Sequence, residues 1–153
     1  MGEFAGVAAL LEHDCWSLLR STDLGRLAVV VGSWPDIFPI NFIVDHGSIV
    51  FRTAEGTKLS ASTTTSPVAF EADGFDIETR TAWSVVVKGS AQRIILRQEQ
   101  IETMRLPLFP MQNGPKEHFV RIEPAVVSGR SFHVVEHVTW MTPVMTAHQA
   151  SVD

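Results

Sequence analysis

The stretch Ile49-Val50-Phe51-Arg52-Thr53-Ala54-Glu55-Gly56-Thr57-Lys58-Leu59-Ser60 brings a strand, a turn and the start of a helix together in one short segment. Its first three residues are β-branched or aromatic and favour a strand, and its Glu-Gly pair favours a turn. Thr57 then begins a predicted helix whose first turn contains Lys58. Arg52, Lys58 and the free N–H groups of the helix start can all face one anion. We interpret the stretch as a phosphate-binding site, with a solvated basic surface as the alternative.

The composition is that of one folded domain with a real core, because 45% of the 153 residues are hydrophobic and 19% are charged. The formal net charge of -5 argues against a nucleic-acid-binding protein. Cys15 is the single cysteine, which excludes an intramolecular disulfide, and we expect it to pack in an apolar segment. The N-terminal residues have neither the basic region of a signal peptide nor a membrane-spanning apolar run. We therefore expect a cytoplasmic protein.

Hydrophobic spacing and turn residues divide the rest of the chain into short elements. Apolar residues at helical spacing predict an amphipathic helix from about residue 8 to 20, and shorter helices are expected at 57–64 and 98–104. Turns are expected at Trp34–Asp36 and Asp73–Asp76. Apolar and β-branched runs predict strands at Leu24–Gly32, Ile37–Asp45, Ile49–Thr53, Val68–Ala72, Ala82–Leu96, His118–Ile122 and Ala125–Val135.

These elements add up to six or seven antiparallel strands joined by hairpins, without repeated βαβ units. We therefore predict a mainly β protein with flanking helices (α+β), built as a small β-barrel. Gly89 is expected to mark a bulge within the longest strand. Residues 1–137 are taken as the domain and 138–153 as a C-terminal arm or tail. The proline-rich loop at 106–115 is expected to be a lid or rim of the site, with a plain connector as the alternative.

An ordered series of segments carries a resemblance to a known family. The series comprises Leu24-Gly25-Arg26-Leu27-Ala28, Phe38-Pro39-Ile40-Asn41-Phe42, Ile49–Thr53 with Gly56-Thr57-Lys58-Leu59, Pro67-Val68-Ala69-Phe70-Glu71, and Trp83–Ala91. In order and spacing, these segments resemble the pyridoxamine 5'-phosphate oxidase-like flavoproteins over roughly residues 10 to 134. That family has a split β-barrel and usually forms homodimers.

The resemblance implies that the chain binds FMN, or alternatively a deazaflavin of the F-420 type. It implies a cofactor phosphate held by Arg52, Thr53, Thr57 and Lys58, with Leu59 beside them, and an isoalloxazine ring lying along Pro39, Ile40, Asn41 and Phe42. Trp83 and Ser84 would approach the cofactor from a neighbouring strand or subunit. The implied assembly is a homodimer with flavin sites at the interface, acting on a small molecule and binding neither nucleic acid nor membrane.

The sequence departs from the vitamin-synthesising oxidase of that family. It lacks that enzyme's C-terminal substrate-phosphate motif, of which Gly129–His133 is only a faint echo, so activity on pyridoxamine phosphate is not expected. Asn41 can equally face solvent, and Trp83 can equally belong to the core or an interface. No metal site is predicted from the six histidines, although a haem ligand at His133 or His137 is an alternative within the fold family.

No catalytic constellation stands out in the sequence, so the catalytic residues are left unknown. Three hypotheses follow. The first is an FMN-dependent oxidoreductase, in which the flavin carries the chemistry. The second is a deazaflavin-dependent reductase, which would need a basic groove for the cofactor tail. The third is a flavin-binding or flavin-sensing module without turnover, or a plain interaction protein with a degenerate site.

Overall fold

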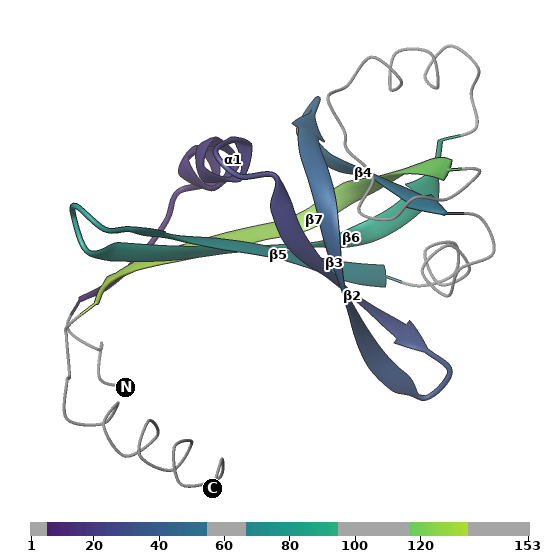
Figure 1. Cartoon of the computed structure of the whole chain (residues 1–153), viewed down its shortest axis with the longest axis horizontal. Coiled ribbons are helices and arrows are strands. Elements are labelled where there is room, and N and C mark those ends of the chain that lie inside the picture. Colours follow the sequence, from purple (N-terminus) through teal and green to yellow (C-terminus); the bar gives the residue numbers. More distant parts are fainter. Residues whose placement is uncertain (1–5, 55–66, 95–116, 135–153) are drawn as a thin grey trace, which may run out of the picture.

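The protein forms seven strands and one helix in a computed structural model that describes residues 6–54, 67–94 and 117–134 (Figure 1). The elements are β1 Val7–Ala9, α1 Glu12–Arg20, β2 Leu24–Val31, β3 Trp34–Asp45, β4 Ser48–Ala54, β5 Pro67–Asp76, β6 Thr81–Arg93 and β7 Glu117–His133. The predicted helices at 57–64 and 98–104, the loop at 106–115 and the tail at 138–153 lie outside the described residues.

The strands close into a barrel. Their order is β1-β7-β4-β3-β2-β5-β6, all pairings are antiparallel, and β6 returns to pair with β7. The closed ring therefore contains six strands, and β1 adds to β7 outside it. The pairing of β2 with β5 is the shortest in the ring, from Arg26 opposite Glu71 to Ala28 opposite Ala69. The prediction of six or seven antiparallel strands in a β-barrel is confirmed.

The barrel core follows from the two-residue period of its strands. On β2, Gly25, Leu27 and Val29 are buried while their neighbours are exposed or half-buried. Phe42 of β3 and Phe70 of β5 meet edge to face inside the barrel, with ring centroids 4.7 Å apart. Each such fully buried aromatic side chain contributes roughly 1.5–3 kcal/mol to stability. The core therefore rests on residues that the alternating pattern already marked as apolar.

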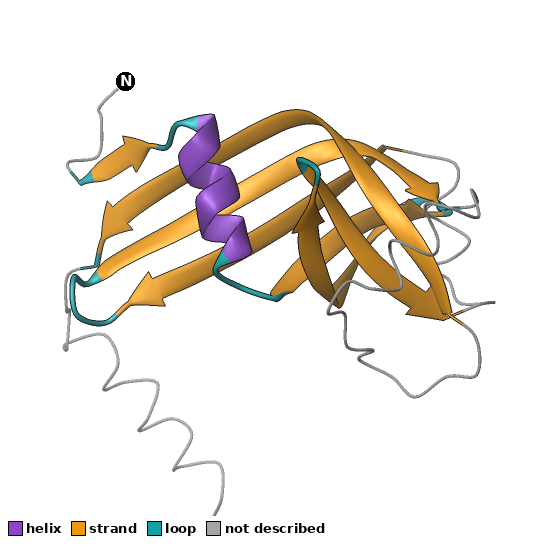
Figure 2. Ribbon diagram, turned by 90° about the horizontal axis from the view of Figure 1, so that it is seen from above, coloured by secondary structure: helices purple, strands orange, loops and turns teal. Residues whose placement is uncertain are grey.

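The helix α1 packs across the sheet, as Figure 2 shows, and its buried residues are Cys15, Trp16 and Leu19. It lies close to β7 because position 129 is glycine. A Cβ on Gly129 would approach the Cys15 sulfur to 2.6 Å. Burial, with Asp14 as a lesser cause, raises the pKa of the Cys15 thiol, which keeps it protonated. The expectation that Cys15 serves packing agrees with this placement.

Two predicted element boundaries at the N-terminal side were wrong. The helix begins at Glu12 instead of residue 8, because Val7–Ala9 pairs with β7 as a short strand. The predicted turn Trp34–Asp36 belongs to β3. Gly32 takes the turn instead, with a φ of 62° that glycine adopts without cost.

The predicted turn Asp73–Asp76 was also wrong, because these residues extend β5 and pair with β6. The chain turns after Asp76, whose carboxylate accepts hydrogen bonds from the N–H groups of Glu78 at 2.9 Å and Thr79 at 3.2 Å. An aspartate that bonds the backbone two residues on favours a turn at that point. The turn signal in the sequence was real, but it acted at the last residue of the segment.

The two predicted closing strands are one strand, β7. The pairing with β6 shifts where Lys88 lies opposite Val126 and Gly89 lies opposite Pro124, which leaves Ala125 as an extra residue on β7. A bulge of this kind tolerates a proline, since the regular hydrogen-bond ladder is interrupted there. The bulge predicted at Gly89 is confirmed. A Cβ at that position would overlap the carbonyl oxygen of Glu123.

Gly89→Ala should therefore destabilise the fold by about 2 kcal/mol or more, because the obstructing atom belongs to the backbone and cannot rotate away. Urea unfolding of the variant and the wild type would measure the change. Ser90→Ala, on the exposed neighbouring residue of β6, is the matched control and should stay within about 0.5 kcal/mol of wild type. Equal stability of Gly89→Ala and wild type would contradict the packing at this bulge.

Candidate functional site

The site predicted from the sequence lies where β3 and β4 part. These strands are paired from Asp45 opposite Ser48 to Phe42 opposite Phe51. Beyond that pair, β4 continues along β7, whereas β3 continues along β2 (Figure 1). Asn41 and Arg52 are the next residues on the two strands. They therefore flank the opening between β3 and β4 on the outside of the barrel.

The β3 residues that were predicted to lie along the flavin ring point alternately to the two faces of the strand. Ile40 and Phe42 are each only 3% exposed and belong to the core. Pro39 is exposed and Asn41 is half-buried, and both point to the outer face. A ligand at the outer face would therefore meet the side chains of Pro39 and Asn41, and only the main chain of Ile40 and Phe42.

Arg52 and Thr53 point to opposite faces of β4. The Arg52 guanidinium lies over the Phe119 ring of β7, 5.4 Å from its centroid, on the outer face. Thr53 is 5% exposed and faces inward. Because β4 ends one residue later at Ala54, both side chains lie at the same end of the barrel. The other predicted phosphate ligands, Thr57 and Lys58, lie with Leu59 outside the described residues.

Trp83 and Ser84 lie at the opposite end of the molecule from Arg52. Trp83 pairs with Ser131 near the end of β7, whereas Arg52 pairs with Phe119 near its start. At about 3.3 Å per residue, the strand between those two β7 residues covers roughly 40 Å. The structure therefore does not bring Trp83 and Ser84 to Arg52 within one chain.

The local environments of Trp83 and Ser84 differ. The Trp83 indole is half-buried beside Gly74, where a Cβ would approach the ring nitrogen to 2.5 Å, and it packs against the core. Ser84 lies opposite Asp73 on one side and Arg130 on the other. Ser84 is thus one member of a polar row on the outer face of the sheet.

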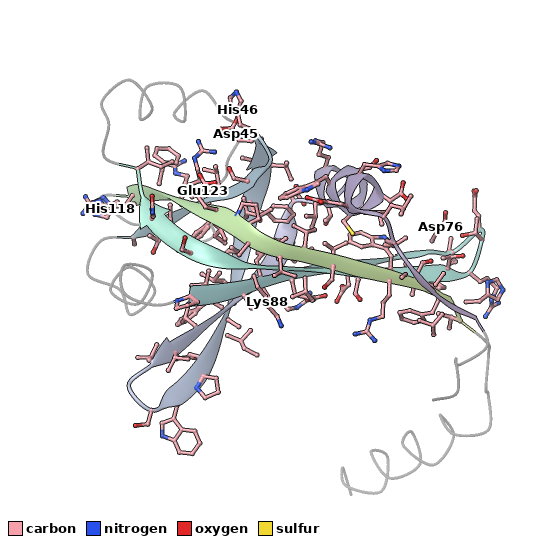
Figure 3. The ribbon with its side chains drawn as sticks, turned by 180° about the vertical axis from the view of Figure 1, so that it is seen from behind. Asp45, His46, Asp76, Lys88, His118 and Glu123 are labelled. Atoms are coloured by element: carbon pink, nitrogen blue, oxygen red, sulfur yellow. The ribbon has the colours of Figure 1, made fainter. Side chains whose placement is uncertain are left out.

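A cluster around Arg121, which the sequence did not predict, fixes the β3–β4 hairpin on β7. Arg121 donates to the Asp45 carboxylate at 2.9 Å, to the Asp45 carbonyl at 3.1 Å and to the Ser48 hydroxyl at 2.6 Å. His46 and Gly47 make the turn with positive φ, and Figure 3 shows His46 beside Asp45 at its tip. The cluster holds the strand that carries Arg52.

A second unpredicted cluster lies at the end of the barrel near Arg52. Arg93 of β6 donates a hydrogen bond to Nδ1 of His118 on β7, and His118 lies directly opposite Thr53 of β4. Figure 3 shows His118 at this end of the molecule. The partners are 25 residues apart, so neither motif nor spacing links them in the sequence. The only signal there was a histidine at the start of a predicted strand.

The outer face between the two ends carries a third charged cluster. Arg26 of β2 contacts Glu71 at 3.0 Å and Asp73 at 3.3 Å, both on β5. Burial, followed by the neighbouring Asp73 carboxylate, raises the pKa of Glu71. Arg26 therefore neutralises a carboxylate pair on the sheet surface.

Comparisons with known proteins add to this geometry. The family model described as pyridoxamine 5'-phosphate oxidase matches residues 12–131. An uncharacterized protein of Mycobacterium tuberculosis is 35% identical over 128 residues, which are 80% of this chain and 84% of that protein.

Among the described residues, no helix combines the length and apolar content needed to cross a membrane.

Two solved structures resemble the chain over most of its length. The FAD binding protein from Mycobacterium smegmatis is 38% identical, with a TM-score of 0.73, and the match covers 83% of this chain and 99% of that one. A protein from Corynebacterium glutamicum, provisionally named a pyridoxamine 5'-phosphate oxidase, is 37% identical, with a TM-score of 0.76 and coverage of 88% and 100%.

From the Arg121 cluster we predict how the stability of the fold depends on pH. Burial alone would raise the pKa of Asp45, but hydrogen bonds and charge from Arg121 and His46 outweigh it and lower this pKa below 3.8. A lowered carboxyl pKa stabilises the fold above the unfolded-state value, and this stabilisation is lost as the pH falls through the folded-state value. Asp45→Asn should therefore cost about 1.5–3 kcal/mol at pH 7.

This cost should shrink as the pH falls below the pKa of the Asp45 carboxyl group in the unfolded chain, because the unfolded wild type then binds a proton that the folded wild type binds only at lower pH. Urea unfolding at pH 7 and at about pH 3, below the ordinary aspartate pKa, would measure both values. Asp23→Asn, on an exposed aspartate, is the control and should have little effect at either pH. A difference between Asp45→Asn and wild type that does not change with pH would contradict the assignment.

Proposed function

The chain belongs to the pyridoxamine 5'-phosphate oxidase family, and from that premise we propose that it is a flavin-binding oxidoreductase. It would transfer hydride or electrons between FMN and a small organic substrate, in the cytoplasm. The observation that carries the proposal is the position of Asn41 and Arg52, directly beyond the last residue pair of β3 and β4. A bound flavin supplies the redox chemistry. The protein's part is to bind and orient it.

The residues at the parting of β3 and β4 fit a flavin phosphate. Arg52 presents planar N–H donors that match phosphate oxygens in pairs, and the Phe119 ring beneath it limits the orientations of the guanidinium. The positive charge of Arg52 compensates the charge of a phosphate. Lys58 and Thr57, which follow in the sequence, would add a second cation and a hydroxyl group.

The neighbouring β3 residues fit the ring of a flavin. The Asn41 side chain offers both donors and an acceptor, and the edge of an isoalloxazine ring presents amide-like groups that need both. Pro39 is exposed on the same face and offers an apolar surface. Asn41 and Pro39 would thus orient the ring, while Arg52 would hold the phosphate.

The flavin itself can be of more than one type. We propose FMN as the cofactor. A solved structure of 38% identity is named an FAD binding protein, and this name supports a flavin of some type. A deazaflavin of the F-420 type is the alternative on the same fold. A non-catalytic flavin-binding module would use the same residues without turnover, and an assay of flavin reduction separates it from an enzyme.

We also propose a homodimer in which the site of one subunit is completed by the other. The family resemblance implies that Trp83 and Ser84 contact the cofactor. In their own chain, however, they are separated from Arg52 by roughly 40 Å along β7. A two-fold arrangement would bring the start of β6 of one subunit to the β3–β4 opening of its partner, and the same contact would then occur twice.

The outer face near Trp83 offers apolar surface for such a contact. Val7, Phe132, Ala82 and Phe75 lie opposite one another in a single row across β1, β7, β6 and β5. Phe75 is 52% exposed, Val7 48% and Phe132 36%. Exposed aromatic and aliphatic residues in one contiguous row are typical of a protein interface.

Arg52→Ala should weaken FMN binding by roughly 10- to 100-fold, because hydrogen bonds to charged groups contribute about 1.5–3 kcal/mol. Lys58→Ala should weaken it in the same direction. Titration of the flavin-free protein, followed by flavin absorbance and fluorescence, measures both. Arg20→Ala, on the exposed end of α1, removes the same charge elsewhere and should bind FMN as the wild type does.

The absorption spectrum of the purified protein tests the cofactor class directly. A flavin, a deazaflavin and a haem each give a distinct spectrum, and a flavin spectrum is expected. Wild-type affinity in both Arg52→Ala and Lys58→Ala would refute the phosphate site. A protein that stays colourless after incubation with FMN and FAD would refute the flavin proposal.

Phe132→Asp should convert the dimer to a monomer at micromolar concentration, since a charge within an apolar contact is costly to bury. Flavin affinity should fall with it, because the partner's Trp83 region is lost. Sedimentation equilibrium with and without FMN measures both effects. Ser17→Asp on the exposed side of α1 is the control. A stable wild-type monomer that binds flavin would contradict the shared site.

A further inference from the structure

Two prolines of β3 have their main chain turned away from β2. The N–H group of Phe42 donates to the carbonyl oxygen of Asp23 at 3.0 Å, which continues the pairing of the two strands by one residue. Hydrogen-bonded and non-hydrogen-bonded pairs alternate along an antiparallel ladder. Counted back from Phe42, the pairs that contain Pro39, Ile37 and Pro35 are therefore non-hydrogen-bonded. The main-chain groups of these three residues point to the other edge of β3, which faces the opening toward β4.

Pro39 explains why β3 and β4 part. Their last pair is Phe42 opposite Phe51, and extending that register would place Pro39 opposite Ala54. Proline has no N–H group, so this position lacks the donor that the ladder needs. Among the described strands, β3 continues with β2 alone, and Figure 1 shows these two strands leaving the barrel as a ribbon. A proline thus sets the opening of the proposed site.

The edge of β3 at the opening offers hydrogen-bond acceptors. Pro35 and Pro39 contribute carbonyl oxygens and no N–H groups. The N–H group of Ile37 already donates to the carboxylate of Asp36 at 3.1 Å. Ile37 is 66% exposed and both prolines are exposed, so solvent reaches this edge. We call the carbonyl groups of Ile37 and Pro39 the acceptor edge.

The acceptor edge is unsuited to a further strand, because strand addition needs N–H donors from both chains. It suits a ligand that brings its own N–H or O–H groups. A carboxylate or phosphate oxygen would meet these carbonyl oxygens without a proton between them. The two sides of the opening therefore differ, since Arg52 on β4 donates hydrogen bonds whereas the acceptor edge on β3 accepts them.

The acceptor edge extends beyond the residues that are proposed to hold the cofactor. At about 3.3 Å per residue, Pro39 lies roughly 7 Å and Ile37 roughly 13 Å along β3 from Asn41. The proposed cofactor contacts use the side chains of Asn41 and Pro39 and leave the carbonyl groups of the acceptor edge without a role. These groups are therefore placed beside the ring, where a substrate has to dock.

We propose that the acceptor edge binds the substrate through N–H or O–H groups of the substrate. The protein then selects amides, amines or alcohols over molecules of the same shape that only accept hydrogen bonds. The inference rests on the proposed flavin site, because it takes the ring at Asn41 as the place where the substrate docks. It adds the chemical class of the substrate to that proposal.

Binding of benzamide and acetophenone to the FMN-loaded protein tests the proposal. The two molecules have the same shape, but benzamide has an NH₂ group where acetophenone has a methyl group. Perturbation of the flavin absorbance at saturating FMN measures both affinities. The wild type should bind benzamide roughly three- to tenfold more tightly, because one hydrogen bond between neutral groups contributes about this much. Equal affinities, or no binding of benzamide, would overturn the acceptor edge.

Variants that add a donor to the edge provide a second test. Asp36→Ala leaves the N–H group of Ile37 without its carboxylate, and Pro39→Ala introduces an N–H group. Both should reduce the preference for benzamide to about twofold or less. Asp36→Asn keeps an oxygen acceptor for Ile37 and should keep the wild-type preference. Pro35→Ala makes the same exchange roughly 13 Å from Pro39 along the strand and should also keep it.

Asp36→Ala keeps the test decisive if Pro39→Ala loses its flavin, because Asp36 has no part in the proposed flavin site. Circular dichroism would show that each variant folds. An unchanged preference in Asp36→Ala would overturn the acceptor edge. A wild type that binds FMN but does not distinguish the two probes would overturn it as well and leave the flavin function standing. A wild type that binds no flavin would refute that function together with the inference.

Discussion

The long antiparallel pairing of β6 with β7 is the constraint on which the rest of the structure depends. It runs from Thr81 opposite His133 to Arg93 opposite Val120 and closes the barrel. The bulge at Gly89 bends this pair while keeping it continuous. Because the pair is long and nearly unbroken, it holds Trp83 at one end of the molecule and Arg93 at the other. A single chain cannot fold both ends of this pair onto one ligand.

The strands could be predicted from the sequence because burial on one face imposes a two-residue alternation that survives in the residue pattern. Their ends could not. Trp34-Pro35-Asp36 and Asp73–Asp76 have turn-forming composition, yet both pair with neighbouring strands. Local propensity competes there with ladder hydrogen bonds that only the tertiary fold supplies. Pro124 likewise suggested a break, whereas the bulge opposite Gly89 accommodates it.

The candidate site stays a prediction, and the structure adds which of its side chains share a face of the barrel. The same alternation that predicts the strands assigns Asn41 and Arg52 to the outer face and Ile40, Phe42 and Thr53 to the inside. A list of neighbouring residues taken from a resemblance ignores this distinction. The contacts of Arg121 with Asp45 and of Arg93 with His118 join residues 76 and 25 positions apart. Spacing in one sequence does not encode such pairs.

Whether this protein can bind an anion depends more on the positions of individual arginines than on the overall composition. The chain carries a net charge of -5, which disfavours an anionic ligand at long range. Arg26 and Arg121 do not offset this, since each is held by carboxylates of a neighbouring strand or hairpin. Arg52 lies on an aromatic ring and Arg93 on an imidazole, both at one end of the barrel. At the short range of a direct hydrogen bond, a nearby guanidinium acts on a ligand more strongly than the distant charges of the chain, which salt screens. An acidic protein can thus offer a local anion site where strand ends converge.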